Sequence, residues 1–197
     1  MLDRVFTKRL SISIRTKMKI VLGILTALSL LNVSPVNAAR KIVLDARIEE
    51  AIEEFYEQTS AGKKLAKKAE GMLVFPTVGK AGFGIGGEYG EGALIIKGET
   101  VQYYSSAAAS IGFQIGVQSK RQVILFMEKS DLESFQHSEG WEVGVDGSVA
   151  IATLGAGGEI DTKMLNQPVV GFVFGNKGLM FNLSFEGTKF SRIEKNK

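Results

Sequence analysis

Acidic side chains beside glycines are the first candidates for chemistry in this sequence. Four of them stand in or next to glycine-rich stretches: Glu88, Glu91, Asp146 and Glu159. A pair of carboxylates can supply the general acid and the general base for glycan hydrolysis. The competing interpretation is that they occupy solvent-facing strand or turn positions, and no nucleophile and base occur at a recognisable spacing. We therefore expect a protein without enzymatic activity and without catalytic residues. A hydrolase is the less favoured alternative.

A glycine-rich run is the second candidate. Gly82, Gly84 and Gly87 satisfy the letter of the G-x-G-x-x-G pattern. That pattern needs a strand before it and a helix after it, because the helix N-terminus holds the phosphate. Residues 88–96 instead read as strand and turn, so we predict a bent strand and no nucleotide cofactor. A single histidine, His137, and the lack of cysteine leave no recognisable metal site or disulfide.

Lysine side chains point to binding rather than catalysis. A helix predicted over residues 61–70 carries four of them on an arc of about 140°: Lys63, Lys64, Lys67 and Lys68. A cationic face backed by an apolar one can rest on anionic lipid headgroups, each lysine adding about 1 kcal/mol. We predict lipid binding by these lysines, with Leu65 entering the interface and Lys80 as a helper. In the competing interpretation, the lysines only complement the helix dipole and keep the surface soluble.

The first 38 residues have the order of a secretory signal peptide. Six basic residues precede the apolar run 20–31, and small residues follow it. That run has 12 residues, fewer than the roughly 20 of a spanning helix. We predict cleavage after Ala38, with Ala39 as a near alternative, and an exported, periplasmic domain that associates with the membrane. An uncleaved membrane anchor is the competing interpretation.

The predicted mature chain, residues 39–197, has the size of a single domain. The leader holds 6 of the 24 basic and 1 of the 21 acidic residues, which leaves 18 basic and 20 acidic side chains, a net charge of −2. Nucleic-acid binders usually carry a strongly basic domain. We therefore expect no nucleic-acid partner.

Two helices are predicted ahead of the sheet. Apolar residues at three- and four-residue steps indicate an amphipathic helix from about Arg40 to a break at residues 59–62: Leu44, Ile48, Ala51, Ile52 and Phe55. Thr59 or Ser60 can cap the second helix, and Gly71 suits its C-terminal end.

Strand signals dominate the rest of the chain. Within residues 71–97 we predict an approach strand, a turn at Pro76, and a glycine-loaded strand leading into a hairpin. Ser130 and Glu133 form a capping box for a short helix. Glycines on successive strands suit sharp curvature. The predicted class is α+β: a predominantly antiparallel, strongly curved, glycine-rich β-sheet or barrel with N-terminal helices packed on it. Further strands are expected over residues 100–104, 110–118, 122–127, 141–150, 169–174 and 179–187.

Two long glycine-containing runs, residues 75–92 and 110–119, keep a defined order of aromatic, glycine and polar residues. With these runs the sequence resembles the SYLF domain, also called the Ysc84 or Las17-binding actin-regulator family. The likeness extends through residues 123–127, 143–150 and 178–187, and so covers nearly all of the predicted mature chain.

The resemblance implies a single lipid-binding domain. Eukaryotic members bind phosphoinositides through a basic, amphipathic helical part, and bacterial members are usually exported single-domain proteins. The leader makes this chain similar to the bacterial type, to which actin regulation is not carried over. The family commonly has Ala-Lys-Gly where this chain has Ala69-Glu70-Gly71, and an exported protein meets other anionic lipids first. We expect an anionic phospholipid membrane surface as partner; an envelope scaffold that binds a protein is the alternative.

Overall fold

The computed structural model describes residues 34–154, 166–177, 185 and 187–195. The chain divides into two units, residues 1–41 with 196–197 and residues 42–195, and the fold below is that of the second. The described helices are α2 (Ser34–Gln58), α3 (Ser60–Ala66) and α4 (Lys129–His137); the strands are β1 (Gly71–Ile96), β2 (Glu99–Phe126), β3 (Trp141–Glu142), β4 (Ala150–Thr153), β5 (Val169–Lys177) and β6 (Lys189–Ile193). Among the described residues, no helix combines the length and the hydropathy that crossing a bilayer requires.

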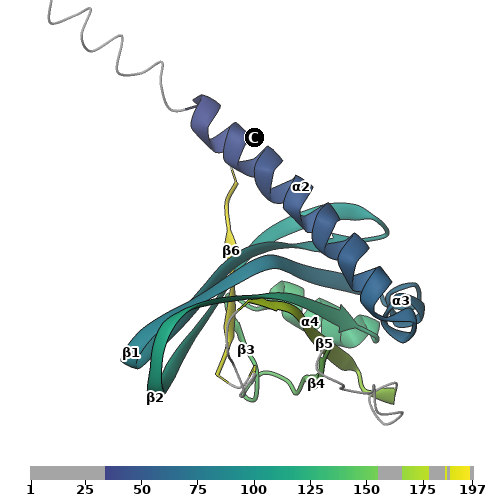
Figure 1. Cartoon of the computed structure of the whole chain (residues 1–197). Coiled ribbons are helices and arrows are strands. Elements are labelled where there is room, and N and C mark those ends of the chain that lie inside the picture. Colours follow the sequence, from purple (N-terminus) through teal and green to yellow (C-terminus); the bar gives the residue numbers. More distant parts are fainter. Residues whose placement is uncertain (1–33, 155–165, 178–184, 186, 196–197) are drawn as a thin grey trace, which may run out of the picture. The chain divides into compact units, whose positions relative to one another are not determined.

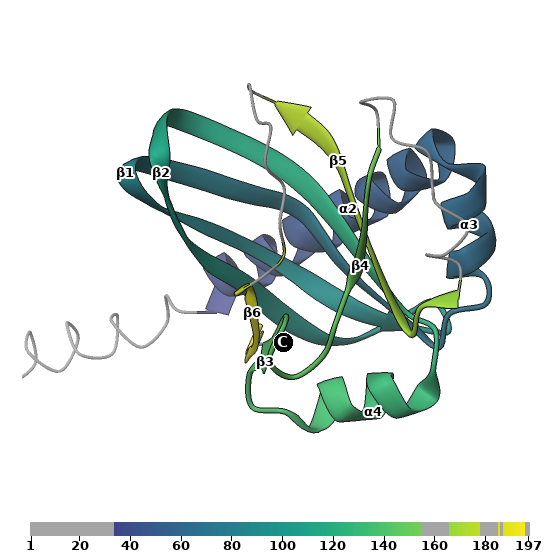
Figure 2. The ribbon, with the colours of Figure 1, turned by 90° about the horizontal axis from the view of Figure 1, so that it is seen from below.

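β1 and β2 form one long antiparallel ribbon that doubles back on itself (Figures 1 and 2). A two-residue turn joins them at Lys97 and Gly98, whose φ angles of 53° and 83° suit a type I′ hairpin turn. Pairing shifts register between Phe75 and Val78 and again between Gly82 and Gly84, and such irregularities bend a strand. We call residues 71–82 the outgoing limb of β1 and residues 84–96 its returning limb.

The other strands extend this ribbon into a six-stranded sheet in the described part of the chain. Its order is β3–β6–β2–β5–β4, with β1 paired to β2. β6 pairs with residues 103–107 of β2, whereas β5 pairs with residues 119–126, beyond the bend. Among the described strands, only β4 and β5 pair in parallel. The result is a strongly curled half-barrel, which confirms the predicted fold class in its curved-sheet form.

The two limbs of β1 lie against each other at a separation that excludes side chains. A Cβ atom on Gly90 would lie 2.7 Å from the Thr77 carbonyl oxygen, and one on Gly92 would overlap the Val74 carbonyl oxygen. Because these obstacles are backbone atoms, they cannot turn aside as a flexible side chain can. Close backbone approach therefore explains part of the glycine-rich run.

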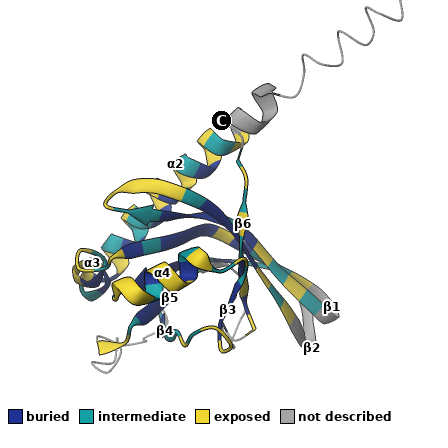
Figure 3. Ribbon diagram, turned by 180° about the vertical axis from the view of Figure 1, so that it is seen from behind, coloured by how far each residue is buried: buried dark blue, intermediate teal, exposed yellow. Residues whose placement is uncertain are grey.

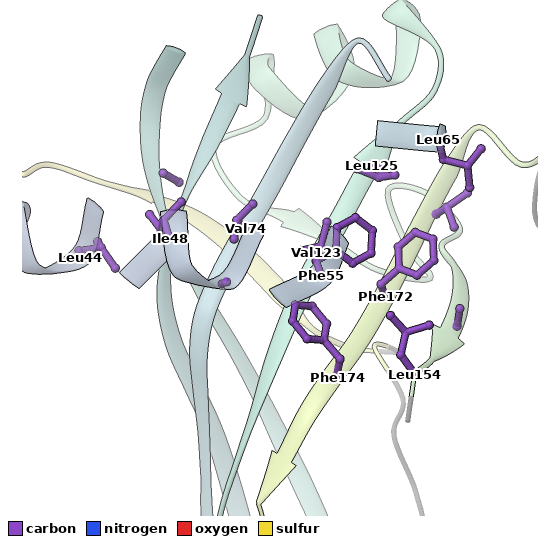
Figure 4. Close-up of a cluster of buried hydrophobic side chains, with 14 of the residues drawn as sticks. Leu44, Ile48, Phe55, Leu65, Val74, Val123, Leu125, Leu154, Phe172 and Phe174 are labelled. Atoms are coloured by element: carbon purple, nitrogen blue, oxygen red, sulfur yellow. The ribbon is translucent and has the colours of Figure 1, made fainter. Parts of the chain in front are cut away.

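α2 covers one face of the sheet from residue 42 onward, through the apolar stripe that the sequence predicts. Phe55 anchors this contact, with its ring centroid 4.9 Å from that of Phe172 and 5.8 Å from that of Phe174 (Figure 4). Arg121 of β2 adds an ion pair to Glu54 of α2 at 3.1 Å. Burying one large apolar side chain such as that of Phe55 contributes about 1.5–3 kcal/mol to the stability of the fold. Within residues 40–58 of α2, the buried side chains are Leu44, Ile48, Ala51 and Phe55.

A second apolar cluster fills the opposite face, next to α4. The ring of Phe135 from α4 lies 4.8 Å from both Tyr104 and Phe126, and 5.9 Å from Trp141. Figure 3 shows the exposed residues of α4 on its outer side and the buried ones toward the strands. Because both faces of the sheet are covered here, residues 123–126 are an uninterrupted apolar run.

Two predictions made from local sequence are wrong ahead of the bend in the ribbon, because strand pairing decides the structure there. Pro76 makes no turn; it lies inside β1 at the first register shift, where a missing N–H donor is tolerated. The helix predicted over residues 61–70 ends at Ala66, and Gly71 begins β1 instead of ending that helix. The first predicted helix is confirmed.

Later boundaries differ as well. The three strands predicted between residues 100 and 127 are the single strand β2, and the strand predicted over residues 141–150 is split into β3 and β4. The predicted capping box does not form, because Ser130 lies inside α4, where its hydroxyl donates to Asp131 at 3.3 Å. The predicted last strand, residues 179–187, lies outside the described residues except at 185 and 187.

Candidate functional site

α3 is a short helix that is held in place by its contacts with α2 and the core. As predicted, Thr59 caps it, its side-chain oxygen accepting a hydrogen bond from the Gly62 N–H at 3.1 Å. A Cβ on Gly62 would lie 2.6 Å from the Phe55 ring, so the helix sits directly on the core of α2. Leu65 is 7% exposed and joins the same core. These contacts fix the backbone that carries the lysines.

The four predicted lysines are all exposed on α3 and the turn that follows, and we call them the lysine surface: Lys63, Lys64, Lys67 and Lys68. None pairs with a carboxylate in the part of the chain that the structure describes. The Lys63 ammonium lies 5.4 Å from the centre of the Tyr56 ring. Because α3 ends at Ala66, Lys67 and Lys68 lie in a turn, and the predicted helical arc describes only the first two lysines.

The other two predicted lipid-binding residues lie elsewhere. Leu65 faces the core, not the interface that we predicted for it, because α3 uses this side chain as its anchor. Lys80 is nine residues into β1, about 30 Å along the strand from Gly71. It belongs to an internal ion pair and does not extend the lysine surface.

That ion pair joins the two limbs of β1 through Glu88. Lys80 Nζ lies 3.4 Å from one carboxylate oxygen of Glu88, and Lys120 Nζ of β2 lies 2.6 Å from the other. The side chains of Lys120 and Glu88 are only 6% and 11% exposed. Phe185 lies over Lys120, its ring centre 6.0 Å from the ammonium. Lys80 is thus a structural cation in the bend of the half-barrel.

A groove opens beside the lysine surface, between α2, the α3–β1 connection and the β1–β2 turn. Its volume is about 440 Å³, and we call it the lysine groove because three lysines line it. The main lining residues are Tyr56, Lys67, Lys68, Met72, Ile95 and Lys97. Three lysines line the groove: Lys67 and Lys68 from the α3–β1 connection, and Lys97 from the β1–β2 turn. The type I′ turn fixes the backbone of Lys97. Burial raises the pKa of the Tyr56 phenol above its usual value near 10, so the group is a neutral O–H donor at pH 7.

A second hollow of about 230 Å³ continues the lysine groove along α2. Ile52 adds to the apolar lining there, whereas Glu49 makes this end acidic. Glu49 precedes Tyr56 by seven residues, about 10 Å along the helix. Asp45 also lines this end, and its carboxylate accepts a hydrogen bond from the Tyr103 hydroxyl at 2.6 Å. The continuous groove is therefore basic at one end, apolar in the middle and acidic at the other. The two hollows share Tyr56, Met72, Ile95 and Gly98.

Comparison with known families concerns the C-terminal half of the fold. Residues 107–197 match the family model of Ysc84, described as a Las17-binding protein actin regulator. Over residues 107–197 the chain is therefore similar to the Ysc84 family. The resemblance seen in the sequence is confirmed over this range, which is shorter than the range of the likeness and begins inside β2. The lysine surface and the lysine groove precede the Ysc84 match. No match was found among curated proteins.

The Ysc84 family is not a known enzyme family, and the candidate carboxylates are dispersed. Glu88 is held by two lysines, and Glu91 pairs with Lys195 at 2.6 Å. Being three residues apart on one strand, Glu88 and Glu91 point to opposite faces. Asp146 lies in an exposed turn, where it accepts a backbone N–H at 2.6 Å. Glu159 lies outside the described residues. Glu88, Glu91 and Asp146 therefore do not make the acid–base pair of a glycosidase.

His137 is the last residue of α4. It is exposed, and its ring nitrogen lies 2.7 Å from the Glu133 carbonyl oxygen at the last turn of α4. Within the described ranges, no three histidine or carboxylate side chains gather in a way that could hold a metal ion.

Lys97 and Tyr56 are two of the groove residues that the sequence reasoning missed. Gly98 follows the apolar run 93–96 and is a turn signal, which would have placed Lys97 at the end of β1. Nothing local shows that this turn lies beside residues 67–68, because that contact follows from the path of the doubled-back ribbon. Tyr56 stands at the edge of the apolar stripe of α2, where its exposure depends on α3.

Proposed function

We propose that this chain is a peripheral lipid-binding module that contacts an anionic phospholipid membrane through the lysine surface. One observation carries the proposal. Four lysine side chains are exposed together on a backbone anchored by Gly62 and Leu65, and none of them forms an ion pair with a described carboxylate. The Ysc84 family, an actin-regulator and lipid-binding type, supports a lipid partner.

The proposed mechanism is mainly Coulombic. Each lysine close to an anionic membrane adds about 1 kcal/mol, and this attraction falls off within a Debye length of about 10 Å at 0.1 M salt. Leu65 stays in the core, so this surface inserts no large apolar side chain of its own. Added salt should therefore weaken binding strongly.

We also propose that residues 1–38 are a signal peptide and that the mature domain works outside the cytoplasm. The support is the basic, apolar and small-residue order of the leader. Cleavage after Ala38 would shorten α2 at its N-terminal end, ahead of its buried residues Leu44 and Ile48. Expression in a bacterium with an export pathway should give a periplasmic protein with Ala39 as first residue by mass spectrometry. A full-length protein in the cytoplasm would contradict this proposal.

We propose a binding role without catalysis. The lack of a carboxylate pair among Glu88, Glu91 and Asp146 supports it, as does a family that is not known for enzymes. The alternative of an envelope scaffold predicts a protein partner whose capture is insensitive to salt. Lipid binding predicts the opposite response to salt.

Co-sedimentation with vesicles tests the proposed lipid contact. The chain is mixed with neutral phosphatidylcholine vesicles and with vesicles that also contain phosphatidylglycerol or cardiolipin. Salt is set at about 0.05 M and about 0.3 M, which shortens the Debye length by more than half. We expect binding only to the anionic vesicles and its loss at the higher salt. Equal binding to neutral vesicles, or none to anionic ones, would overturn the proposal.

A further inference from the structure

We propose that the lysine groove binds one phospholipid molecule, with the phosphate at Lys67, Lys68 and Lys97 and an acyl chain on Met72 and Ile95. This inference rests on the proposed lipid contact and makes it specific. A charged surface attracts many headgroups at once, whereas a groove of this kind selects a single lipid by shape and by the position of its phosphate.

The basic end of the groove is preorganised for a phosphate. The Lys68 N–H donates to the Leu65 carbonyl oxygen at 2.8 Å, which fixes the turn that carries Lys67 and Lys68. Lys97 comes from the β1–β2 turn, whose two residues both have positive φ. Three lysines and one glutamate, Glu70, line this part of the groove, a net charge of +2. Ammonium groups from two fixed segments can thus surround one anionic group.

The middle of the groove suits the apolar part of the same molecule. Ile52, Met72 and Ile95 are partly buried and pack on the core under α2, so they form an apolar lining that remains accessible from the groove. Tyr56 lines both hollows, and its neutral hydroxyl can donate to an ester or phosphate oxygen. An inorganic phosphate ion would leave this apolar lining uncovered, which favours a lipid over a free anion.

The acidic end gives the groove a direction. Glu49 and Asp45 repel a phosphate and leave the lysine end as the only favourable place for it in the groove. With a volume of about 440 Å³, the basic part falls in the roughly 300–1,000 Å³ range of small-molecule sites. The adjoining 230 Å³ gives a chain room to continue toward Ile52.

A matched pair of charge variants separates a groove from a charged surface. Lys97→Gln and Lys64→Gln each remove one exposed lysine charge, but only Lys97 lines the groove. Titration calorimetry uses dihexanoyl-phosphatidylglycerol below its micelle concentration as the probe. We expect Lys97→Gln to weaken its binding by about tenfold, the equivalent of about 1.4 kcal/mol, and Lys64→Gln by less than about threefold.

The outcomes distinguish the groove from the proposed membrane contact. Vesicle binding without binding of the monomeric lipid, or equal losses in both variants, would overturn the groove and leave the membrane contact standing. Inorganic phosphate that displaces the lipid at equal concentration would show a free-anion site and overturn the lipid assignment. If the unmodified chain bound neither the anionic vesicles nor the monomeric lipid, both proposals would be overturned.

Discussion

Glu88 and Lys80 belong to the same strand yet meet as an ion pair across its bend, with Lys80 Nζ 3.4 Å from the Glu88 carboxylate. Lys120 of β2 completes the group at 2.6 Å. The pair joins the outgoing and returning limbs of β1, where little solvent reaches. It therefore stabilises the curvature of the half-barrel rather than any ligand.

Replacing Glu88 should destabilise the fold. In Glu88→Gln, Lys80 and Lys120 keep their charges in a mostly buried place without a counter-charge, which should cost about 3 kcal/mol in the free energy of unfolding. Urea titration followed by circular dichroism measures it. Glu133→Gln is the control, because its ion pair to Lys129 is exposed and worth less than about 1 kcal/mol. Equal effects of the two variants would contradict the structural role of Glu88.

Gly92 should tolerate no side chain. In Gly92→Ala the new methyl group would overlap the Val74 carbonyl oxygen, so the limbs of β1 must separate. We expect a loss of more than about 3 kcal/mol or no cooperative unfolding transition. In the control Gly87→Ala, the nearest atom to the new Cβ is the Ala108 carbonyl oxygen at 3.8 Å, an ordinary contact. A Gly92→Ala protein as stable as Gly87→Ala would show that the limbs are not closely packed.

Leu65 should matter for stability and not for lipid. Leu65→Ala leaves a cavity under α3 and should cost about 2–5 kcal/mol by thermal or urea unfolding. At a temperature where the variant is folded, its vesicle binding should equal that of the unmodified chain. Weakened vesicle binding at unchanged stability would show instead that Leu65 enters the lipid interface.

Glu70 should oppose lipid binding. It lines the lysine groove, so Glu70→Gln removes a negative charge next to three lysines and should tighten binding of monomeric phosphatidylglycerol by about threefold to fivefold. The control Glu139→Gln changes an exposed residue of the loop after α4 and should leave the affinity unchanged. Identical gains in both variants would point to net charge rather than to the groove.

Periodicity predicted those parts of the fold that depend on local pattern. The buried face of α2 followed from the spacing of Leu44, Ile48 and Phe55, and the curved sheet followed from the glycines. Pro76 was misread because a proline usually breaks a strand, whereas the register shift beside it removes the need for its missing N–H. The single long strand β2 was read as three because small residues at 105–109 and polar residues at 119–121 separate its apolar runs.

The candidate site was only half accessible to sequence reasoning. A cluster of lysines is visible in the sequence, and the structure leaves Lys63, Lys64, Lys67 and Lys68 exposed, whereas their contact with lipid stays a prediction. The burial of Leu65 depends on where α3 sits on Phe55, and the place of Lys97 depends on the path of a 26-residue strand. Neither long-range relationship leaves a local signal.

The most direct test of the lysine surface is vesicle binding by a quadruple variant in which Lys63, Lys64, Lys67 and Lys68 all become glutamine. Unfolding is measured in parallel, and it should change little because all four side chains are exposed. On vesicles containing phosphatidylglycerol at about 0.05 M salt, we predict that the variant loses at least about a hundredfold in affinity. Unchanged binding by a folded quadruple variant would contradict the account.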